Sequence, residues 1–252
     1  MAAAEKEAAE LVMHAHNILS ETKSGSRDVV TEYDRRVQLF LEERMRQALP
    51  DAHFFCEELG EREDLSSEHM FVIDPIDGTM NFVRGFNHSC ISMAYAHKGV
   101  FCAACVYNPY VNELFTAVRG QGAFLNGKPL QITDRPLSDS VVCFGTSPYY
   151  EGLTERTFAL TERAFKAALD VRREGSAELD LCSVAAGRAG VFFELSLSMW
   201  DYAAGALIIS EAGGRCCTIE GEELPYDGRI SSVAAGSPAA LEEFLRIAEV
   251  CP

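Results

Sequence analysis

The residues best suited to chemistry lie between Asp74 and Thr79, where the sequence reads Asp-Pro-Ile-Asp-Gly-Thr. The apolar residues 71–73 directly before them predict a short buried strand, and the proline and glycine predict a turn where the strand ends. Asp74 and Asp77 would repel each other there unless cations lay between them. Because magnesium prefers oxygen ligands, paired carboxylates at a strand end indicate a magnesium site.

The turn itself is suited to an anion. If a helix begins after it, the backbone N–H groups of Gly78 and Thr79 are free at the helix N-terminus, where the helix dipole also favours phosphate. The alternative interpretation is that Asp77 caps a helix and Asp74 lies in an ordinary turn, as in most Asp-Pro and Asp-Gly sequences. The stretch alone leaves both interpretations open.

Two further acids stand at the edges of apolar segments and would complete a metal site. Glu57 follows the predicted strand 52–56, and Asp201 precedes the strongly apolar predicted helix 202–212. Glu57 could instead belong to a solvated acidic loop, and Asp201 could be a helix cap that contributes about 1 kcal/mol. A cap and a metal ligand can be the same carboxylate. Together the acids favour the metal interpretation of residues 74–79.

Length and charge limit the classes to which the protein can belong. The chain has 252 residues, of which 48% are hydrophobic, enough for one large domain or two small domains that share a core. A formal net charge of -16 argues against nucleic acid or an anionic membrane as a partner. The sequence begins without a signal-peptide pattern and has no run of about 18 apolar residues that could span a membrane. We therefore expect a cytoplasmic protein.

The cysteines and histidines do not predict a second metal site. The 9 cysteines are scattered and mostly lie in apolar runs, which indicates reduced thiols in the core. Cys102 and Cys105 have the spacing of a zinc-binding pair, but no second such pair accompanies them, so core packing is favoured. His14 and His16 cannot share one face of a helix, so we do not expect them to be ligands.

Hydrophobic periodicity predicts the elements of the first half of the chain. A first helix over residues 3–20 would carry Glu5 on its solvent face, and a second helix would occupy residues 31–48. Residues 90–131 predict three or four antiparallel strands, including a hairpin turn at Asn126-Gly127.

From residue 141 the pattern restarts as strands alternating with helices, which predicts a second α/β lobe. A helix over residues 154–169 would bury Phe158 and Phe165. Earlier in the chain, the small residues beside Lys23 predict a loop, either a plain connection or a flap that brings a cation to the site.

Several separated motifs occur in register along the chain: Glu57-Glu58, Asp74-Pro75-Ile76-Asp77-Gly78-Thr79-Met80-Asn81-Phe82, Trp200-Asp201-Tyr202-Ala203-Ala204-Gly205 and Glu211-Ala212-Gly213-Gly214. In this order they resemble the inositol monophosphatase family of magnesium-dependent, lithium-sensitive phosphatases. Further segments that match the family are Lys23-Ser24-Gly25-Ser26, Val30-Thr31, Asp34, Gly175-Ser176-Ala177 and Leu179-Asp180-Leu181. The resemblance covers essentially the whole chain, and separated motifs in register are far more specific than a single acid-proline turn.

The resemblance implies two principal metal positions. Glu57, Asp74 and the carbonyl of Ile76 would bind a first Mg²⁺. Asp74, Asp77 and Asp201 would bind a second, with Asp74 bridging the two. This agrees with the independent expectation that a two-metal site needs more carboxylates than one turn can supply.

The resemblance also implies the catalytic group. Thr79, supported by Asp34 or Glu57, would orient and deprotonate the attacking water. The N–H groups of Gly78 and Thr79 would hold the phosphate. Family members are often described with a third, weaker metal near Glu57 and Lys23, so we expect two or three Mg²⁺ ions per site.

Substrate contacts follow from the same comparison. Ala177, Glu194 and the outer edges of Asp77 and Asp201 would meet the alcohol part of the substrate. Glu178 stands beside them where a small residue is commoner in the family.

The implied fold is a layered αβαβα sandwich of the sugar phosphatase type, a single compact unit. An N-terminal lobe over residues 1–135 would carry most metal ligands, and a C-terminal lobe over residues 136–252 would contribute Asp201 and the substrate contacts. The site would lie between the lobes. The resemblance further implies a homodimer.

The expected activity is Mg²⁺-dependent hydrolysis of inositol monophosphate or a related small sugar or polyol phosphate by metal-activated water. The alternatives within the family are fructose-1,6-bisphosphatase, histidinol-phosphatase and nucleotide (NADP-type) phosphatase activity. Asn81-Phe82 resembles the inositol and sugar branch more than the branch for sulfated nucleotides. A non-catalytic regulatory protein on this scaffold is the alternative from another class, and the retention of all the acids disfavours it.

Overall fold

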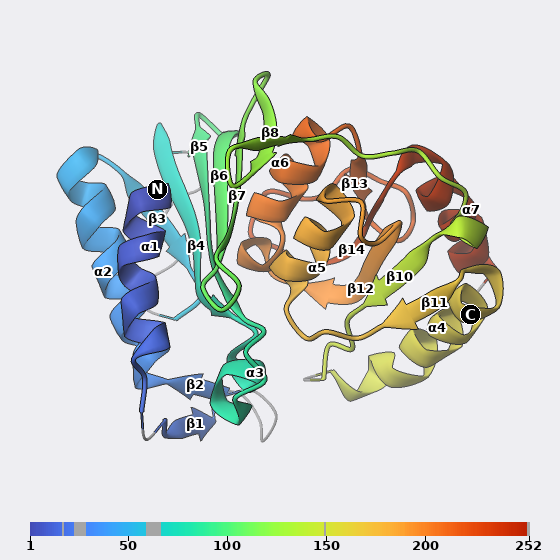
Figure 1. Ribbon diagram of the computed structural model, residues 1–252, viewed down its shortest axis with the longest axis horizontal. Coiled ribbons are helices and arrows are strands. Elements are labelled where there is room, and N and C mark those ends of the chain that lie inside the picture. Colours follow the sequence, from blue (N-terminus) through green and yellow to red (C-terminus); the bar gives the residue numbers. More distant parts are fainter. Residues whose placement is uncertain (17, 23–28, 59–66, 149, 251–252) are drawn as a thin grey trace.

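The computed structural model describes residues 1–252 apart from residues 17, 23–28, 59–66, 149 and 251–252. Its helices and two large sheets alternate in layers, which confirms the predicted αβαβα sandwich (Figure 1). In order across the molecule, the layers are α1 (Ala2–Met13) with α2 (Glu32–Ala48), a seven-stranded sheet, α5 (Ala177–Ala185) with α6 (Ala203–Glu211), a five-stranded sheet, and α4 (Thr154–Ala167) with α7 (Pro238–Glu249).

The two N-terminal helices cover the outer face of the seven-stranded sheet. The second helix forms as predicted, because Thr31 and Asp34 make a capping box at its start. The first helix is shorter than predicted, since it ends at Met13 rather than near residue 20. The chain then forms β1 (Ser20–Thr22), which pairs with β2 (Val29–Thr31). The predicted exposure of Glu5 is also wrong, because that side chain is buried under the helix.

The seven-stranded sheet contains more strands than the sequence predicts for residues 90–131. The predicted hairpin is confirmed, because Asn126 and Gly127, with φ values of 50° and 75°, join the last two strands of this sheet in a two-residue turn. Its strands, in order across the sheet, are β3 (His53–Cys56), β4 (His69–Asp77), β5 (Cys90–His97), β6 (Val100–Asn108), β7 (Glu113–Val118), β8 (Gly122–Leu125) and β9 (Lys128–Leu130).

Strand β4 lies between parallel β3 and antiparallel β5, and it runs further than the sequence predicts. We expected a turn directly after Ile73, but the strand continues to Asp77. The ladder with β5 is irregular between Asp74 and Asp77, as expected where Pro75 has no N–H to donate. This irregularity brings both carboxylates to the same end of the strand.

The five-stranded sheet includes β11, which the sequence analysis missed, and its helix α4 differs from the prediction. Phe158 and Phe165 are each 55% exposed, because α4 buries the face that carries Leu160 and Ala164. Across the sheet the strands are β11 (Asp170–Arg172), β10 (Val141–Phe144), β12 (Val191–Leu197), β14 (Ser231–Gly236) and β13 (Arg215–Cys217).

Helices α5 and α6 form the layer between the two sheets, and residues from both sheets join them in one apolar core. The helices approach closely at Gly205, where an added Cβ would lie 2.6 Å from the Cβ of Leu181. All cysteines in the described part of the chain are free thiols, as expected. Among the described helices, none combines the length and apolar character needed to cross a membrane.

Candidate active site

A cleft of ≈ 750 Å³ opens where β4 ends and α5 begins. It gathers residues that are far apart in the sequence, from both large sheets and the segments between them. Among the described residues, Asp34 is the only predicted site residue outside the lining, and it contacts the lining residue Thr79 from behind. The predicted site residues in the lining are Glu57, Asp74, Ile76, Asp77, Gly78, Thr79, Ala177, Glu194 and Asp201.

Asp74 is buried at the irregularity of β4, where its Oδ1 accepts a hydrogen bond of 3.0 Å from the N–H of Ile76. Burial raises its pKa well above the usual range, and the negative charges of Glu57, Asp77 and Asp201 raise it further. A carboxyl group in this setting binds either a proton or a cation.

Asp77 lies against the N-terminus of α5. Its Oδ2 accepts hydrogen bonds from the Ser176 hydroxyl at 2.5 Å and from the N–H of Glu178 at 2.7 Å, and its Oδ1 accepts one from Ala177 at 3.2 Å. Burial raises the pKa of Asp77 to about 6 although these bonds lower it. From the described residues Oδ1 accepts only this one long hydrogen bond, so it keeps a lone pair for a metal.

Asp201 ends a short 3-10 helix (Met199–Asp201), and its Oδ2 accepts a 2.6 Å hydrogen bond from the N–H of Ser198. Burial, followed by the charges of Glu57 and Asp77, raises its pKa well above the usual range. We considered Asp201 as a cap for the helix that follows it, and that interpretation is wrong, because its side chain bonds back to Ser198 instead.

Glu178 caps α6 in place of Asp201. Its carboxylate accepts hydrogen bonds from the N–H groups of Ala204, at 3.2 Å, and Gly205, at 2.7 Å. The sequence analysis placed Glu178 beside the substrate region, but its side chain is buried and does not line the cleft. The residue therefore connects the helix that holds Asp77 to the helix that follows Asp201.

Thr79 and Asp34 form the contact that a proton relay requires. The hydroxyl of Thr79 lies 3.2 Å from Asp34 Oδ1 and 3.1 Å from the carbonyl of Ile76. Asp34 Oδ2 is occupied by the N–H and hydroxyl of Thr31 in the capping box of α2. Burial raises the pKa of Asp34 to about 6, so the group is a carboxylate at neutral pH. The cap thus orients the carboxylate that faces Thr79.

Gly78 makes the turn into α3 (Thr79–Arg84), so a helix does begin where the sequence predicts one. Its φ is 88°, and an added Cβ would lie 3.1 Å from the carbonyl oxygens of Gly175 and His88. Both the positive φ and the close backbone exclude other residues at this position.

The opposite wall of the cleft contains Glu194, which we predicted, and Gly145, Ser147 and Arg173, which we did not. Glu194 Oε1 accepts hydrogen bonds from the N–H of Ser147, at 2.7 Å, and from its hydroxyl, at 3.0 Å. Burial raises the pKa of Glu194 to about 7. A Cβ on Gly145 would collide with this carboxylate at 1.8 Å. Arg173 also lines the cleft. Arg173 lies two residues before the Gly175 motif, and this closeness was the one feature of the sequence that could have marked it as a cleft residue.

The donor atoms of the cleft suit magnesium. Glu57, Asp74, Asp77 and Asp201 supply carboxylate oxygens, and the carbonyl of Ile76 adds a neutral one. Hard divalent cations prefer such all-oxygen sets, and their charge would relieve the repulsion that helps to raise the pKa values of Asp74 and Asp201. The residues present therefore fit the expected ion. Lys23, expected near a third ion, lies outside the described residues.

The layered fold and the oxygen-lined cleft define the sugar phosphatase class of α/β proteins. The sequence pattern described as "Inositol monophosphatase family" matches residues 1–251. The chain belongs to this family, which confirms the resemblance found in the sequence.

Individual relatives carry two kinds of name. The Nus factor SuhB of Escherichia coli (strain K12) is 38% identical over 226 residues, which cover 89% of this chain and 84% of the relative. Among solved structures, an IMPase of Thermotoga maritima has a TM-score of 0.89 at 31% identity, covering 98% of this chain and 94% of that one. An IMPase/NADP phosphatase complexed with Mg²⁺ and phosphate has a TM-score of 0.85 at 25% identity, covering 96% and 89%.

Proposed function

We propose that this protein is a Mg²⁺-dependent phosphomonoesterase that hydrolyses inositol monophosphate or a related small sugar or polyol phosphate. The observation that carries the proposal is the convergence of Glu57, Asp74, Asp77 and Asp201 on one cleft that also contains Thr79. The names of the solved relatives support it, because one is an IMPase and another is an IMPase/NADP phosphatase with Mg²⁺ and phosphate.

The metal ligands would divide into two sets that share Asp74. Glu57, Asp74 and the Ile76 carbonyl would hold one Mg²⁺, and Asp74, Asp77 and Asp201 a second. A third ion beside Glu57 is part of the same proposal. When bound, the ions supply Lewis acidity that polarises the phosphate ester and lowers the pKa of a water molecule.

The chain's own residues would position the nucleophile and receive its proton. The Thr79 hydroxyl accepts the proton of the attacking water and passes its own proton to Asp34 Oδ1, which lies 3.2 Å away. The bond from phosphorus to the alcohol oxygen breaks as the bond to the water oxygen forms, and the departing alcohol oxygen takes a proton from solvent. The N–H groups of Gly78 and Thr79 would face the phosphate.

Substrate selection would lie on the opposite wall of the cleft. Ala177 and Glu194 would contact the alcohol part, with the outer edges of Asp77 and Asp201. Ser147 holds Glu194 in place, so the carboxylate can accept hydrogen bonds from hydroxyl groups of a polyol. Fructose 1,6-bisphosphate, histidinol phosphate and nucleotide phosphates remain alternative substrates.

The decisive experiment measures phosphate release by the purified protein with and without Mg²⁺. We expect Asp77→Asn to abolish release, while Asp51→Asn, at an exposed position, retains it. Circular dichroism of both variants checks folding. Equal phosphate release by the Asp77 variant and the wild type would contradict the role assigned to Asp77. A panel of the candidate phosphates, compared by kcat/KM, then identifies the substrate.

Two further properties belong to the proposal. We expect a homodimer, so light scattering that gives the mass of one 27.7 kDa chain would contradict it. We also expect cooperative activation by Mg²⁺ and inhibition by millimolar Li⁺, which would replace the ion held by Asp77 and Asp201.

A regulatory function is the second candidate, because close relatives carry the name Nus factor SuhB. The same assay separates the two candidates. A folded protein without activity toward any phosphate in the panel would favour regulation. Activity that depends on Asp77 supports catalysis in this chain.

A further inference from the structure

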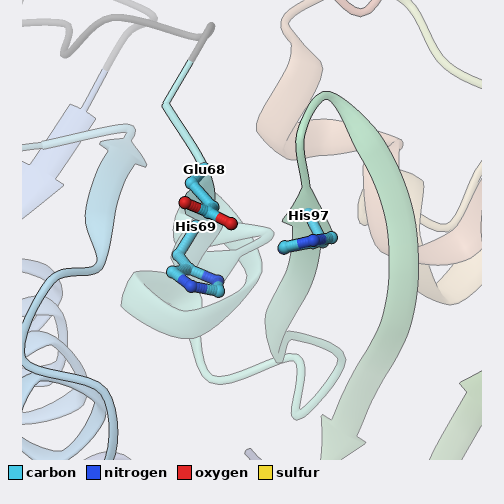
Figure 2. A group of neighbouring side chains, drawn as sticks. All are labelled: Glu68, His69 and His97. Atoms are coloured by element: carbon cyan, nitrogen blue, oxygen red, sulfur yellow. The ribbon is translucent and has the colours of Figure 1, made fainter.

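A second group of metal-ligating side chains lies at the amino end of β4, opposite the end that enters the cleft. The group consists of Glu68, His69 and His97, and Figure 2 shows the two imidazole rings on neighbouring strands with the Glu68 carboxylate beside them. His69 begins β4 and Asp77 ends it. At about 3.3 Å per residue these ends are roughly 26 Å apart. The group is therefore separate from the cleft.

The pairing of the strands sets the position of the two rings. His69 and His97 are direct partners in the antiparallel β4–β5 ladder, so both side chains project from the same face of the sheet. Their ring centroids are 5.1 Å apart, with an angle of 37° between the planes. One ligand atom from each of His69, His97 and Glu68 lies within 4.8 Å of the others.

Neighbouring residues hold the His69 side chain and the Glu68 backbone in place. The Tyr95 hydroxyl lies 2.7 Å from Nδ1 of His69, and the two rings stack with centroids 6.1 Å apart. A metal bound through Nε2 of His69 would leave this bond intact, with Nδ1–H donating to the tyrosine oxygen. The carbonyl of Glu68 accepts a 2.9 Å hydrogen bond from the N–H of Lys98, which fixes Glu68 to the turn after β5.

We propose that Glu68, His69 and His97 bind a zinc ion at the amino end of β4. Two imidazoles and one carboxylate form a nitrogen-rich set that zinc accepts readily and that magnesium disfavours. Zinc bonds of about 2.0–2.2 Å place tetrahedral ligands roughly 3.4 Å apart, so small side-chain rotations close the site. The fourth position is open to water, because Glu68 is exposed and both histidines are partly exposed.

In the absence of a metal, the Lys98 ammonium group pairs with the Glu68 carboxylate. Its Nζ lies 3.2 Å from Glu68 Oε1, and both side chains are largely exposed, at 66% and 58%. Such exposed pairs contribute little free energy, so a divalent ion can replace the ammonium group. The bound ion would join the ends of β4 and β5 to the turn that contains Lys98.

The test is Zn²⁺ binding measured by isothermal titration calorimetry in millimolar Mg²⁺, which occupies the carboxylates of the cleft. We expect one Zn²⁺ per chain in the wild type and binding weaker by about tenfold or more in His69→Gln and in His97→Gln. His14→Gln, which removes an exposed histidine directly after α1, is the matched control and should bind normally.

Lys98→Ala gives a readout that a damaged fold would not produce. Removing the competing ammonium group should tighten Zn²⁺ binding, whereas a nonspecific loss of structure would weaken it. As a second measurement, Cu²⁺ bound to the wild type should show nitrogen hyperfine coupling in its EPR spectrum, and each histidine variant should lose part of it. The cleft ligands supply only oxygen, so nitrogen coupling distinguishes the two sites.

Asp77→Asn identifies which end of β4 binds the ion. Retained Zn²⁺ binding in this variant supports the proposal. Loss of Zn²⁺ binding in Asp77→Asn together with normal binding in both histidine variants would place the ion in the cleft and overturn it. Absence of Zn²⁺ binding by the wild type would overturn it as well.

Discussion

Asp77 shows how the ionisation of one residue is controlled by its neighbours. Burial and the nearby acids favour its protonated form, whereas Ser176 and two N–H groups of α5 favour its charged form. The result is a pKa of about 6, so the carboxylate is charged at neutral pH without being fully solvated. A charged oxygen in a cleft of further acids is ready to bind a cation.

The relay between Thr79 and Asp34 leads to the first prediction. Thr79→Val keeps the shape of the side chain but removes the hydroxyl, so we expect kcat to fall by about 10²–10⁴-fold, the usual contribution of a positioned acid–base group. Thr79→Ser keeps the hydroxyl and should retain most activity. Steady-state kinetics at saturating Mg²⁺ provide the measurement. Similar rates for the valine and serine variants would exclude the hydroxyl from the reaction.

Several site residues could be predicted from the sequence because each acid borders an apolar run. Asp74, Asp77 and Asp201 all enter the cleft on that basis. Ser147 and Arg173 could not be found in the same way, because their position depends on how the five-stranded sheet packs rather than on local pattern. The roles assigned to all these residues stay predictions until they are tested by substitution.

At the scale of elements, α5 and α6 position two of the proposed metal ligands. The N-terminus of α5 binds Asp77, and Glu178 in the same turn binds the first N–H groups of α6, directly after Asp201. The apolar run predicted α6 but could not show that Glu178 caps this helix, since that contact joins residues 26 and 27 positions apart.

The second prediction concerns this contact. Glu178→Ala leaves two buried N–H groups without an acceptor and creates a cavity beside Gly205, so we expect a loss of about 2–4 kcal/mol in the free energy of unfolding. The concentration of Mg²⁺ for half-maximal activity should also rise, because the start of α6 would shift relative to α5. Denaturant unfolding and Mg²⁺ titration measure the two effects. Glu174→Ala, an exposed control before α5, should change neither.

Helix α1 contains a buried acid that an amphipathic pattern cannot identify. Glu5 follows the small residue Ala4 and precedes charged residues, so the sequence favours an exposed position. In the structure both its carboxylate oxygens are buried without a hydrogen-bond partner among the described residues. Burial raises the pKa of Glu5 to about 8, although the nearby Cys105 thiol and the charged N-terminus lower it. The acid therefore enters the core largely protonated at neutral pH.

The third prediction follows from this raised pKa. The protonated acid stabilises the fold fully below its unfolded pKa of 4.5, and that stability is lost as pH rises to the folded value of about 8. Glu5→Gln removes the titration. The free energy of unfolding of the variant, relative to that of the wild type, should therefore grow by up to about 1.4 kcal/mol per pH unit across this window and then level off. Denaturant unfolding at several pH values measures it. Glu10→Gln, exposed on the same helix, should show no such trend.

At the scale of the whole molecule, the cleft depends on contacts between distant parts of the chain. Asp77 from the seven-stranded sheet bonds to Ser176, which is 99 residues further along. The seven-stranded sheet ends at Leu130 and the five-stranded sheet begins at Val141. The predicted division into lobes at residues 1–135 and 136–252 stays a prediction. Because the contact between Asp77 and Ser176 joins distant parts of the chain, we expect the metal site to form only when both sheets are in place.

The last prediction joins metal binding to global stability. The pKa of Asp77 rises from 3.8 to about 6, and those of Asp74 and Asp201 rise well above 3.8, mainly through burial. Because these pKa values are raised, the three groups stabilise the metal-free fold fully below about pH 4. This stabilisation is lost as pH rises through their pKa values in the folded state. Mg²⁺ needs the ionised ligands, so at low pH it must displace protons.

Mg²⁺ should therefore raise the melting temperature more at about pH 8 than at about pH 5, and its binding should release fewer protons at about pH 8, where Asp77, with a pKa of about 6, is already ionised. Calorimetry with and without Mg²⁺ measures the first effect, and titrations in buffers of different ionisation enthalpy measure the second. Asp201→Asn removes one of the titrating ligands and should reduce both. A shift of equal size at both pH values would show that these carboxylates are not the groups that bind the metal.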